Sequence, residues 1–154
     1  DVVGADDCCT TLAIPWIFDL TTVFLAGFGQ GAAVYIHQAS LFNETENQAV
    51  QFDFHLFNAT PTGELRDNAA NDNPLKGDKS KWEGVIEFPN SVANGSTVAT
   101  TTEAIPTNGS NLPKIFHCAS TDTKIYGVLV TRTAFTQTAG DTIRITLKVE
   151  RVGP

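Results

Sequence analysis

The hydrophobic and polar residues of this chain alternate with a period of two in several segments, most regularly in 51–57 and 141–152. Side chains along a β-strand point in turn to opposite faces of the sheet, so this pattern predicts strands with one buried and one solvated face. A further alternating segment, 33–42, and two apolar segments, 81–89 and 124–135, are also predicted strands. The pattern therefore favours β structure along most of the chain.

Turn-forming residues separate these strands at intervals of roughly ten residues. Two pairs of strands are predicted to form β-hairpins, 33–42 with 51–57 and 113–118 with 124–135. About eight antiparallel strands at such intervals are typical of sandwiches and jelly rolls. We therefore predict an all-β fold, a single jelly-roll-like β-sandwich domain over residues 1–154.

The core of this sandwich is predicted from the apolar positions of its strands. Thr, Val, Ile and Phe are plentiful and Met is absent, a composition that suits strands better than helices. The expected core residues are Phe52, Phe54, Leu56, Val85, Ile86, Val128, Val130, Ile143, Ile145 and Leu147.

Two segments stand apart from the regular strands. Segment 1–31 is a predicted arm or edge segment in which Pro15 interrupts an apolar stretch, so 9–19 and 22–28 are expected to form two short strands or one bent strand. Segment 58–81 is the longest polar stretch and is a predicted loop. Loops of that length in a compact domain usually carry a function or an interface.

The charge balance narrows the classes of partner. The formal net charge is -7 at pH 7 and the pI is about 4.7, so a phosphate backbone would be repelled and nucleic-acid binding is not expected. No segment reaches the ~18 uninterrupted apolar residues of a membrane span, so we expect no membrane insertion. Because the chain does not begin with Met, we expect that it is processed or that residues precede Asp1.

The three cysteines, Cys8, Cys9 and Cys118, are an odd number without the spacing of a metal site. Adjacent cysteines rarely pair with each other because the geometry is strained. A bridge from Cys8 or Cys9 to Cys118 is one alternative, and buried free thiols are the prediction we adopt.

Catalytic chemistry has little basis in this sequence. His37, His55 and His117 lie in three predicted strands and would need to converge with a carboxylate such as Asp53, so outward or locally bonded histidines are expected instead. The motifs of nucleophilic and zinc enzymes are absent from the sequence. We therefore expect no enzyme activity and no cofactor.

Three carboxylates in the long loop are candidate calcium ligands. Asp67, Asp72 and Asp78 fit no known calcium-loop spacing, and lysines lie among them. We therefore expect no metal site.

Aromatic residues leave a second kind of function open. Trp16, Tyr35, Trp82 and Tyr126 could form a platform on which sugar rings stack, as in carbohydrate-binding modules, or could belong to the core.

Several short segments point to a family. A strand that ends in Phe and continues into a Pro-Thr turn at 57–62 is followed by Asp-Asn-Ala-Ala at 67–70, Gly-Val-Ile at 84–86 and Tyr-Gly-Val-Leu-Val-Thr-Arg at 126–132. In this order the segments resemble small β-sandwich structural proteins of tailed bacteriophages, the capsid decoration or cement proteins. Together with the strands around them they cover about half of the chain, and segment 8–28 is more apolar than the family pattern.

The resemblance implies a virion structural protein, assembled in the bacterial cytoplasm, that binds the outer face of the major capsid protein shell as a homotrimer. The alternatives are a carbohydrate-binding module and a tail or head-fibre attachment protein. Clustered lysines in the long loop suggest the capsid contacts, for which the candidates are Lys76, Lys79, Lys81, Asp67 and Asn68. The apolar N-terminal stretch suggests the subunit contacts, for which the candidates are Leu12, Ile14, Trp16 and Phe18.

Overall fold

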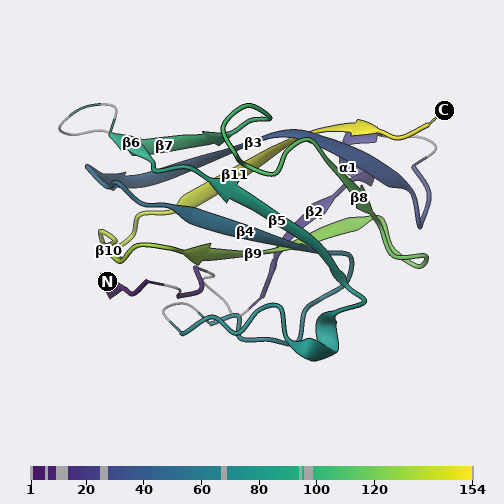
Figure 1. The fold of residues 1–154 in the computed structure, drawn as a ribbon, viewed down its shortest axis with the longest axis horizontal. Helices are drawn as coiled ribbons and strands as arrows, with labels where there is room; N and C mark the ends of the chain where they lie inside the picture. Colours follow the sequence, from purple (N-terminus) through teal and green to yellow (C-terminus); the bar gives the residue numbers. More distant parts are fainter. Residues whose placement is uncertain are drawn as a thin grey trace.

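The computed structural model describes residues 2–5, 7–9, 14–24, 28–66, 69–93, 95 and 99–153. The structure is 48% strand and 5% helix, and two antiparallel sheets pack face to face, which confirms the predicted all-β sandwich (Figure 1). The elements in chain order are β1 (Val2–Val3), β2 (Trp16–Asp19), α1 (Thr21–Phe24), β3 (Ala33–Glu46), β4 (Phe52–Phe57), the 3-10 helix η1 (Lys76–Asp78), β5 (Trp82–Phe88), β6 (Val92–Ala93), β7 (Ala99–Ala104), β8 (Lys114–His117), β9 (Lys124–Thr131), β10 (Phe135–Thr136) and β11 (Ile143–Arg151).

The two sheets differ in size and are assembled from strands distant in sequence. The four-stranded sheet has the order β2-β9-β4-β5, and the five-stranded sheet has the order β11-β3-β7-β6 with β8 also paired to β3. β1 and β10 form a separate two-stranded ribbon. Figure 1 shows the five-stranded sheet above the four-stranded one, with the termini at opposite ends. No helix of the described residues is long and apolar enough to cross a bilayer.

Neither predicted hairpin forms. β3 and β4 do not pair, because β3 lies in the five-stranded sheet and β4 in the four-stranded one. β8 and β9 are likewise in different sheets, β8 in the five-stranded sheet and β9 in the four-stranded one. An alternating pattern specifies which face of a strand is buried. It does not specify whether the next strand pairs beside it or packs opposite it across the core, and here the chain crosses between sheets.

The segment after β2 also differs from the prediction of short strands. Thr21–Phe24 forms one helical turn, because the Asp19 carboxylate accepts hydrogen bonds from the Thr21 backbone N–H at 3.0 Å and from the Thr21 hydroxyl at 2.7 Å. A carboxylate in this position satisfies the free N–H groups at a helix start. Local capping therefore overrides the β-branched composition of this segment.

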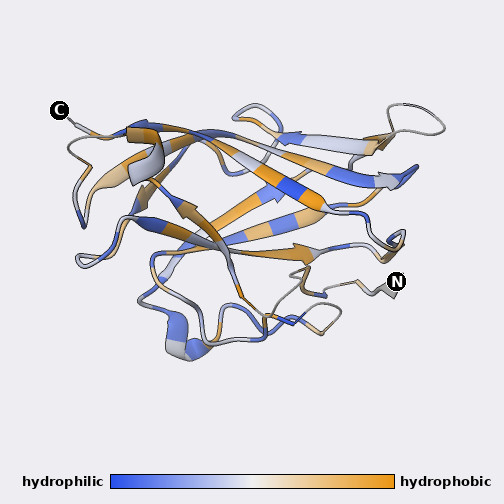
Figure 2. Cartoon of the chain, turned by 180° about the vertical axis from the view of Figure 1, so that it is seen from behind, coloured by the Kyte–Doolittle hydropathy of each residue, from blue (hydrophilic) through white to orange (hydrophobic). Residues whose placement is uncertain are grey.

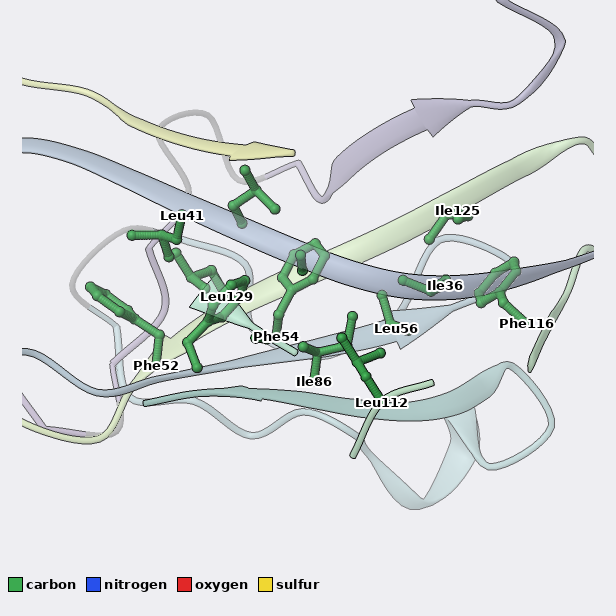
Figure 3. Packing of buried hydrophobic residues seen from close by; sticks show 14 of the residues in the cluster. Ile36, Leu41, Phe52, Phe54, Leu56, Ile86, Leu112, Phe116, Ile125 and Leu129 are labelled. Carbon is green, nitrogen blue, oxygen red and sulfur yellow. The ribbon is translucent and has the colours of Figure 1, made fainter. Parts of the chain in front are cut away.

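The main core lies between the two sheets (Figure 3). Ile36 and Leu41 of β3 face Phe54 of β4 and Leu129 of β9 across this space. The predicted core residues Phe52, Phe54, Leu56, Ile86, Val128, Val130 and Ile145 are buried, whereas Val85, Ile143 and Leu147 are half-buried. Ile143 and Leu147 stay half-buried because β11 is an edge strand.

Gly127 sits where the core is most tightly packed. It belongs to β9, between Trp16 of β2 and Leu56 of β4. A Cβ atom at this position would overlap the tip of the Phe54 ring. The aromatic ring therefore fills the space that a side chain at position 127 would need.

β4 is buried on both faces, although a solvated face was predicted for it. Asp53 is only 5% exposed and His55 only 8%. A second apolar cluster of Cys8, Phe57, Val128 and Val130 forms on this outer side of the four-stranded sheet, with Leu65 and Tyr126 packed against it. Residues 7–9 and the long loop cover the sheet here, as the Cys8 N–H bonds the Ala69 carbonyl at 3.0 Å.

Candidate interaction surfaces

The long loop between β4 and β5 is organised around the carboxylate of Asp78. This side chain is fully buried and accepts hydrogen bonds from the Thr62 N–H at 2.8 Å, the Thr62 hydroxyl at 3.0 Å and the Lys81 ammonium at 2.8 Å. Lys81 also donates to the Thr60 carbonyl at 3.0 Å. Lys81, a predicted capsid contact, is therefore occupied within the loop itself.

The exposed part of this loop lies around η1. Lys76 and Lys79 are exposed, Leu75 is 36% exposed and Trp82 is 40% exposed. We call these four residues the loop patch. Figure 2 shows η1 as a hydrophilic turn at the far end of the loop, away from both sheets. The two other predicted capsid contacts, Asp67 and Asn68, lie outside the described residues.

The predicted subunit contacts of the N-terminal stretch are divided between core and surface. Trp16 and Phe18 pack against the main core, and the Phe18 ring meets the Phe54 ring edge-on with centroids 6.1 Å apart. Ile14 is 54% exposed, and Leu12 lies outside the described residues. Sequence reasoning missed Ile17, which is 52% exposed because it points away from Trp16 and Phe18 along β2.

A groove of about 260 Å³ runs along one side of the sandwich, where β2 and β11 are both edge strands. We call it the edge groove. It is mostly apolar, and its lining comprises Ile17, Phe18, Asp19, Leu20, Thr22, Val23, Leu147 and Val149. Val23 of α1 is 59% exposed here, so apolar surface remains open to solvent along this edge.

The outer face of the five-stranded sheet carries a slightly smaller hollow of about 240 Å³. Its lining includes the Ser40, Thr101 and Thr146 side chains, and Arg144 lies over the Phe42 ring at 5.4 Å from its centroid. This contact is a cation–π interaction that covers the ring. The hollow thus has a mixed polar and apolar lining, and Arg144 covers the aromatic face within it.

The four aromatic residues proposed as a sugar platform do not share a surface. Trp16 packs against the core between the sheets, and Tyr126 packs against the cluster outside the four-stranded sheet. Tyr35 lies on β3 of the other sheet, and Trp82 begins β5. Trp82 and Tyr126 both lie opposite Phe57 of β4, whereas Trp16 and Tyr35 lie elsewhere, so the four rings do not form one platform.

Two of the three histidines meet a carboxylate. His37 Nε2 lies 2.9 Å from Glu150, and His117 Nδ1 lies 3.6 Å from Glu83. These two are exposed strand histidines with local partners, as predicted. Within the described ranges no group of three or more His, Cys, Asp or Glu side chains could hold a metal ion.

His55 differs from the other two because it is buried beside the Asp53–Arg132 ion pair. Burial lowers its pKa, Asp53 partly offsets this effect and Arg132 adds to it. Its Nδ1 atom has no hydrogen-bond partner among the described residues. The structure therefore favours a neutral imidazole inside the covered face of the four-stranded sheet.

Cys8, Cys9 and Cys118 are buried and unbridged, which confirms the prediction of buried free thiols. Burial, together with the nearby carboxylates of Glu64, Asp72 and Asp7, raises the pKa of Cys8 to about 12. Burial and the carboxylates of Asp122 and Glu83 raise the pKa of Cys118 to about 11. Both thiols are thus protonated at neutral pH.

We expect native protein at pH 8 to resist alkylation by iodoacetamide, because the thiolate is the nucleophile, all three thiols are buried, and those of Cys8 and Cys118 are protonated. After denaturation the intact mass will show three added groups, one for each cysteine. The number will be the same with and without prior reduction. A higher number after reduction would reveal a disulfide and contradict the assignment.

Comparison of the chain with protein-family models, with curated proteins and with solved structures found no match.

Proposed function

We propose that this protein is a non-enzymatic structural protein of a tailed bacteriophage that decorates the outer face of the capsid shell. Support comes from three of the segments that resemble cement proteins, 57–62, 84–86 and 126–132, which are neighbours in the structure. Leu56, just before the 57–62 segment, pairs with Gly84 on one side and with Gly127 on the other. These three segments thus meet at adjacent strands of the four-stranded sheet.

The loop patch is the observation that carries the proposal. It combines an exposed leucine and two exposed lysines, on a loop held by the buried Asp78, with an exposed tryptophan at the start of β5. Tryptophan is enriched among the residues that dominate binding energy, and a held loop loses little entropy on binding. The lysines contribute orientation and association rate more than affinity.

The thiols agree with assembly in a bacterial cytoplasm. Cys8, Cys9 and Cys118 are free and buried in the structure, and structural disulfides are rare in reducing compartments. The protein would therefore fold without oxidation.

The test is binding of the purified protein to empty shells assembled from the major capsid protein of the same phage. We expect Trp82→Ala to weaken binding about thirtyfold, because truncating a central tryptophan typically costs about 2 kcal/mol. Lys76→Ala with Lys79→Ala should weaken it several-fold and reduce its salt dependence.

Two controls match these variants. Phe42→Ala removes an aromatic ring of similar exposure, 36%, from the five-stranded sheet, and Lys114→Ala with Lys124→Ala removes the same charge outside the loop patch. Both controls should bind shells like the unmodified protein. Equal losses in control and patch variants would overturn the loop patch as the contact.

Mass spectrometry of purified virions separates the proposal from its alternatives. Recovery with the heads supports decoration, whereas recovery with isolated tails or fibres supports attachment. Failure to bind shells, combined with glycan-array binding that Trp82→Ala abolishes, would replace the proposal with a carbohydrate-binding function.

A further inference from the structure

β11 (Ile143–Arg151) presents a long unpaired edge. It pairs with β3 along its whole length on one side, and among the described residues no strand pairs with its other side (Figure 1). Free N–H and C=O groups on such an edge are a template for a further strand. Nine residues of edge extend over about 30 Å, which is long for an unprotected edge.

Apolar surface lies beside this edge. The inward side chains Leu147 and Val149 are only half-buried and line the edge groove together with Ile17 and Val23, which are 52% and 59% exposed. A strand added to β11 would bring its own inward side chains over this groove. The edge therefore offers both backbone hydrogen bonds and apolar contact to an incoming strand.

We propose that the incoming strand is β11 of a second copy of this chain, paired antiparallel about a two-fold axis at Leu147. In this register Arg144 of each copy faces Glu150 of the other, so two opposite-charge pairs form across the new contact. On the inner side Leu147 meets Leu147 and Ile145 meets Val149. A two-fold contact repeats each interaction in both directions, so one self-complementary strand suffices.

The charges of β11 select this register. Moving the axis to Thr146 would place Arg144 opposite Lys148, and moving it to Lys148 would place that lysine opposite its own copy. Like charges directly opposite each other destabilise a strand pair. Of these three neighbouring axes, at Thr146, Leu147 and Lys148, only the axis at Leu147 avoids both conflicts.

Arg144 and Glu150 are accessible for these contacts. Both are exposed and lie on the outer side of β11, where Arg144 rests over Phe42 and Glu150 meets His37. Within one chain they are about 20 Å apart along the strand, so they do not form an ion pair with each other.

This contact is independent of the proposed function and gives a dimer, in place of the trimer implied by the resemblance. Light scattering or sedimentation equilibrium of the full chain will show a dimer at micromolar concentration. A monomer at all concentrations, or a trimer, would overturn the proposal.

A charge swap tests the register. Arg144→Glu and Glu150→Arg, each alone, place like charges opposite at two points of the symmetric contact and should raise the dissociation constant about tenfold. The double variant Arg144→Glu with Glu150→Arg restores opposite charges and should restore dimerisation. The single variants also lose the contact of residue 144 with Phe42 or of residue 150 with His37 within one chain, and the double variant does not restore these contacts. Recovery in the double variant would therefore come from the contact between the two copies. A double variant that dimerises as weakly as the single variants contradicts the register.

Discussion

Replacing Gly127 with alanine is expected to destabilise the fold by about 3 kcal/mol, because overpacking a well-packed core costs up to that amount and occasionally more. The new Cβ would overlap the tip of the Phe54 ring. That ring is fully buried and is held edge-on by Phe18, so it cannot move aside without displacing a neighbouring strand. Urea unfolding followed by tryptophan fluorescence measures the loss.

Gly77→Ala is the matched control for this substitution. Gly77 lies in η1, and a Cβ there would meet no atom within 4 Å. Its stability change should stay within about 0.5 kcal/mol, as for most surface substitutions. Phe54→Leu removes the ring tip, so Phe54→Leu with Gly127→Ala should cost less than the sum of the two single variants. Strict additivity would show that the ring is not the obstacle.

Replacing Asp78 with alanine is expected to cost about 2 kcal/mol, because a part-buried N–H and a half-buried ammonium lose their acceptor together. The Thr62 N–H and Lys81 both bond this carboxylate, at 2.8 Å each. We also expect the loop patch to lose its shape, which hydrogen exchange at Thr62 and Lys81 will detect. Glu103→Ala, which removes an exposed carboxylate on β7, is the control and should leave stability unchanged.

The same carboxylate predicts a dependence on pH. Burial raises its pKa, but the bonds from Lys81 and Thr62 lower the pKa more, so the folded-state pKa lies below the usual 3.8. A carboxylate whose pKa is lower in the folded than in the unfolded state stabilises the fold. This stabilisation is complete above the pKa of the unfolded state and is lost as pH falls through the pKa of the folded state. The stability difference between the unmodified protein and Asp78→Asn should therefore be constant above about pH 5 and shrink below about pH 4. A difference that stays constant in acid would contradict this role of Asp78.

The positions of most strands follow from the sequence alone. The period-two pattern predicted β4 and β11 and the inward orientation of Phe52, Phe54 and Ile145, because a strand's geometry turns successive side chains to opposite faces. The same reasoning, applied to the four residues of β2, would have placed Ile17 on the surface opposite Trp16. These features depend only on neighbouring residues, which the sequence contains in full.

Part of the candidate site was also predictable. Clustered lysines and the length of the loop pointed to Lys76 and Lys79, which are exposed. The sequence identified Trp82 only as one of several aromatic residues. Its exposure near these lysines is known from the structure. The sequence does not distinguish Lys81 from Lys76 and Lys79. Only the structure shows that Lys81 forms an ion pair with the buried Asp78.

Only the tertiary structure decided which strands pair and what covers each face. β3 and β4 were predicted to be a hairpin and instead lie in opposite sheets, and Asp53 and His55 were assigned to a wet face that residues 7–9 and the long loop cover. These outcomes depend on contacts between segments far apart in the chain, such as Cys8 with Val130 and Asp7 with Ala70. Local alternation determines that a strand has two faces, whereas long-range packing determines what each face meets.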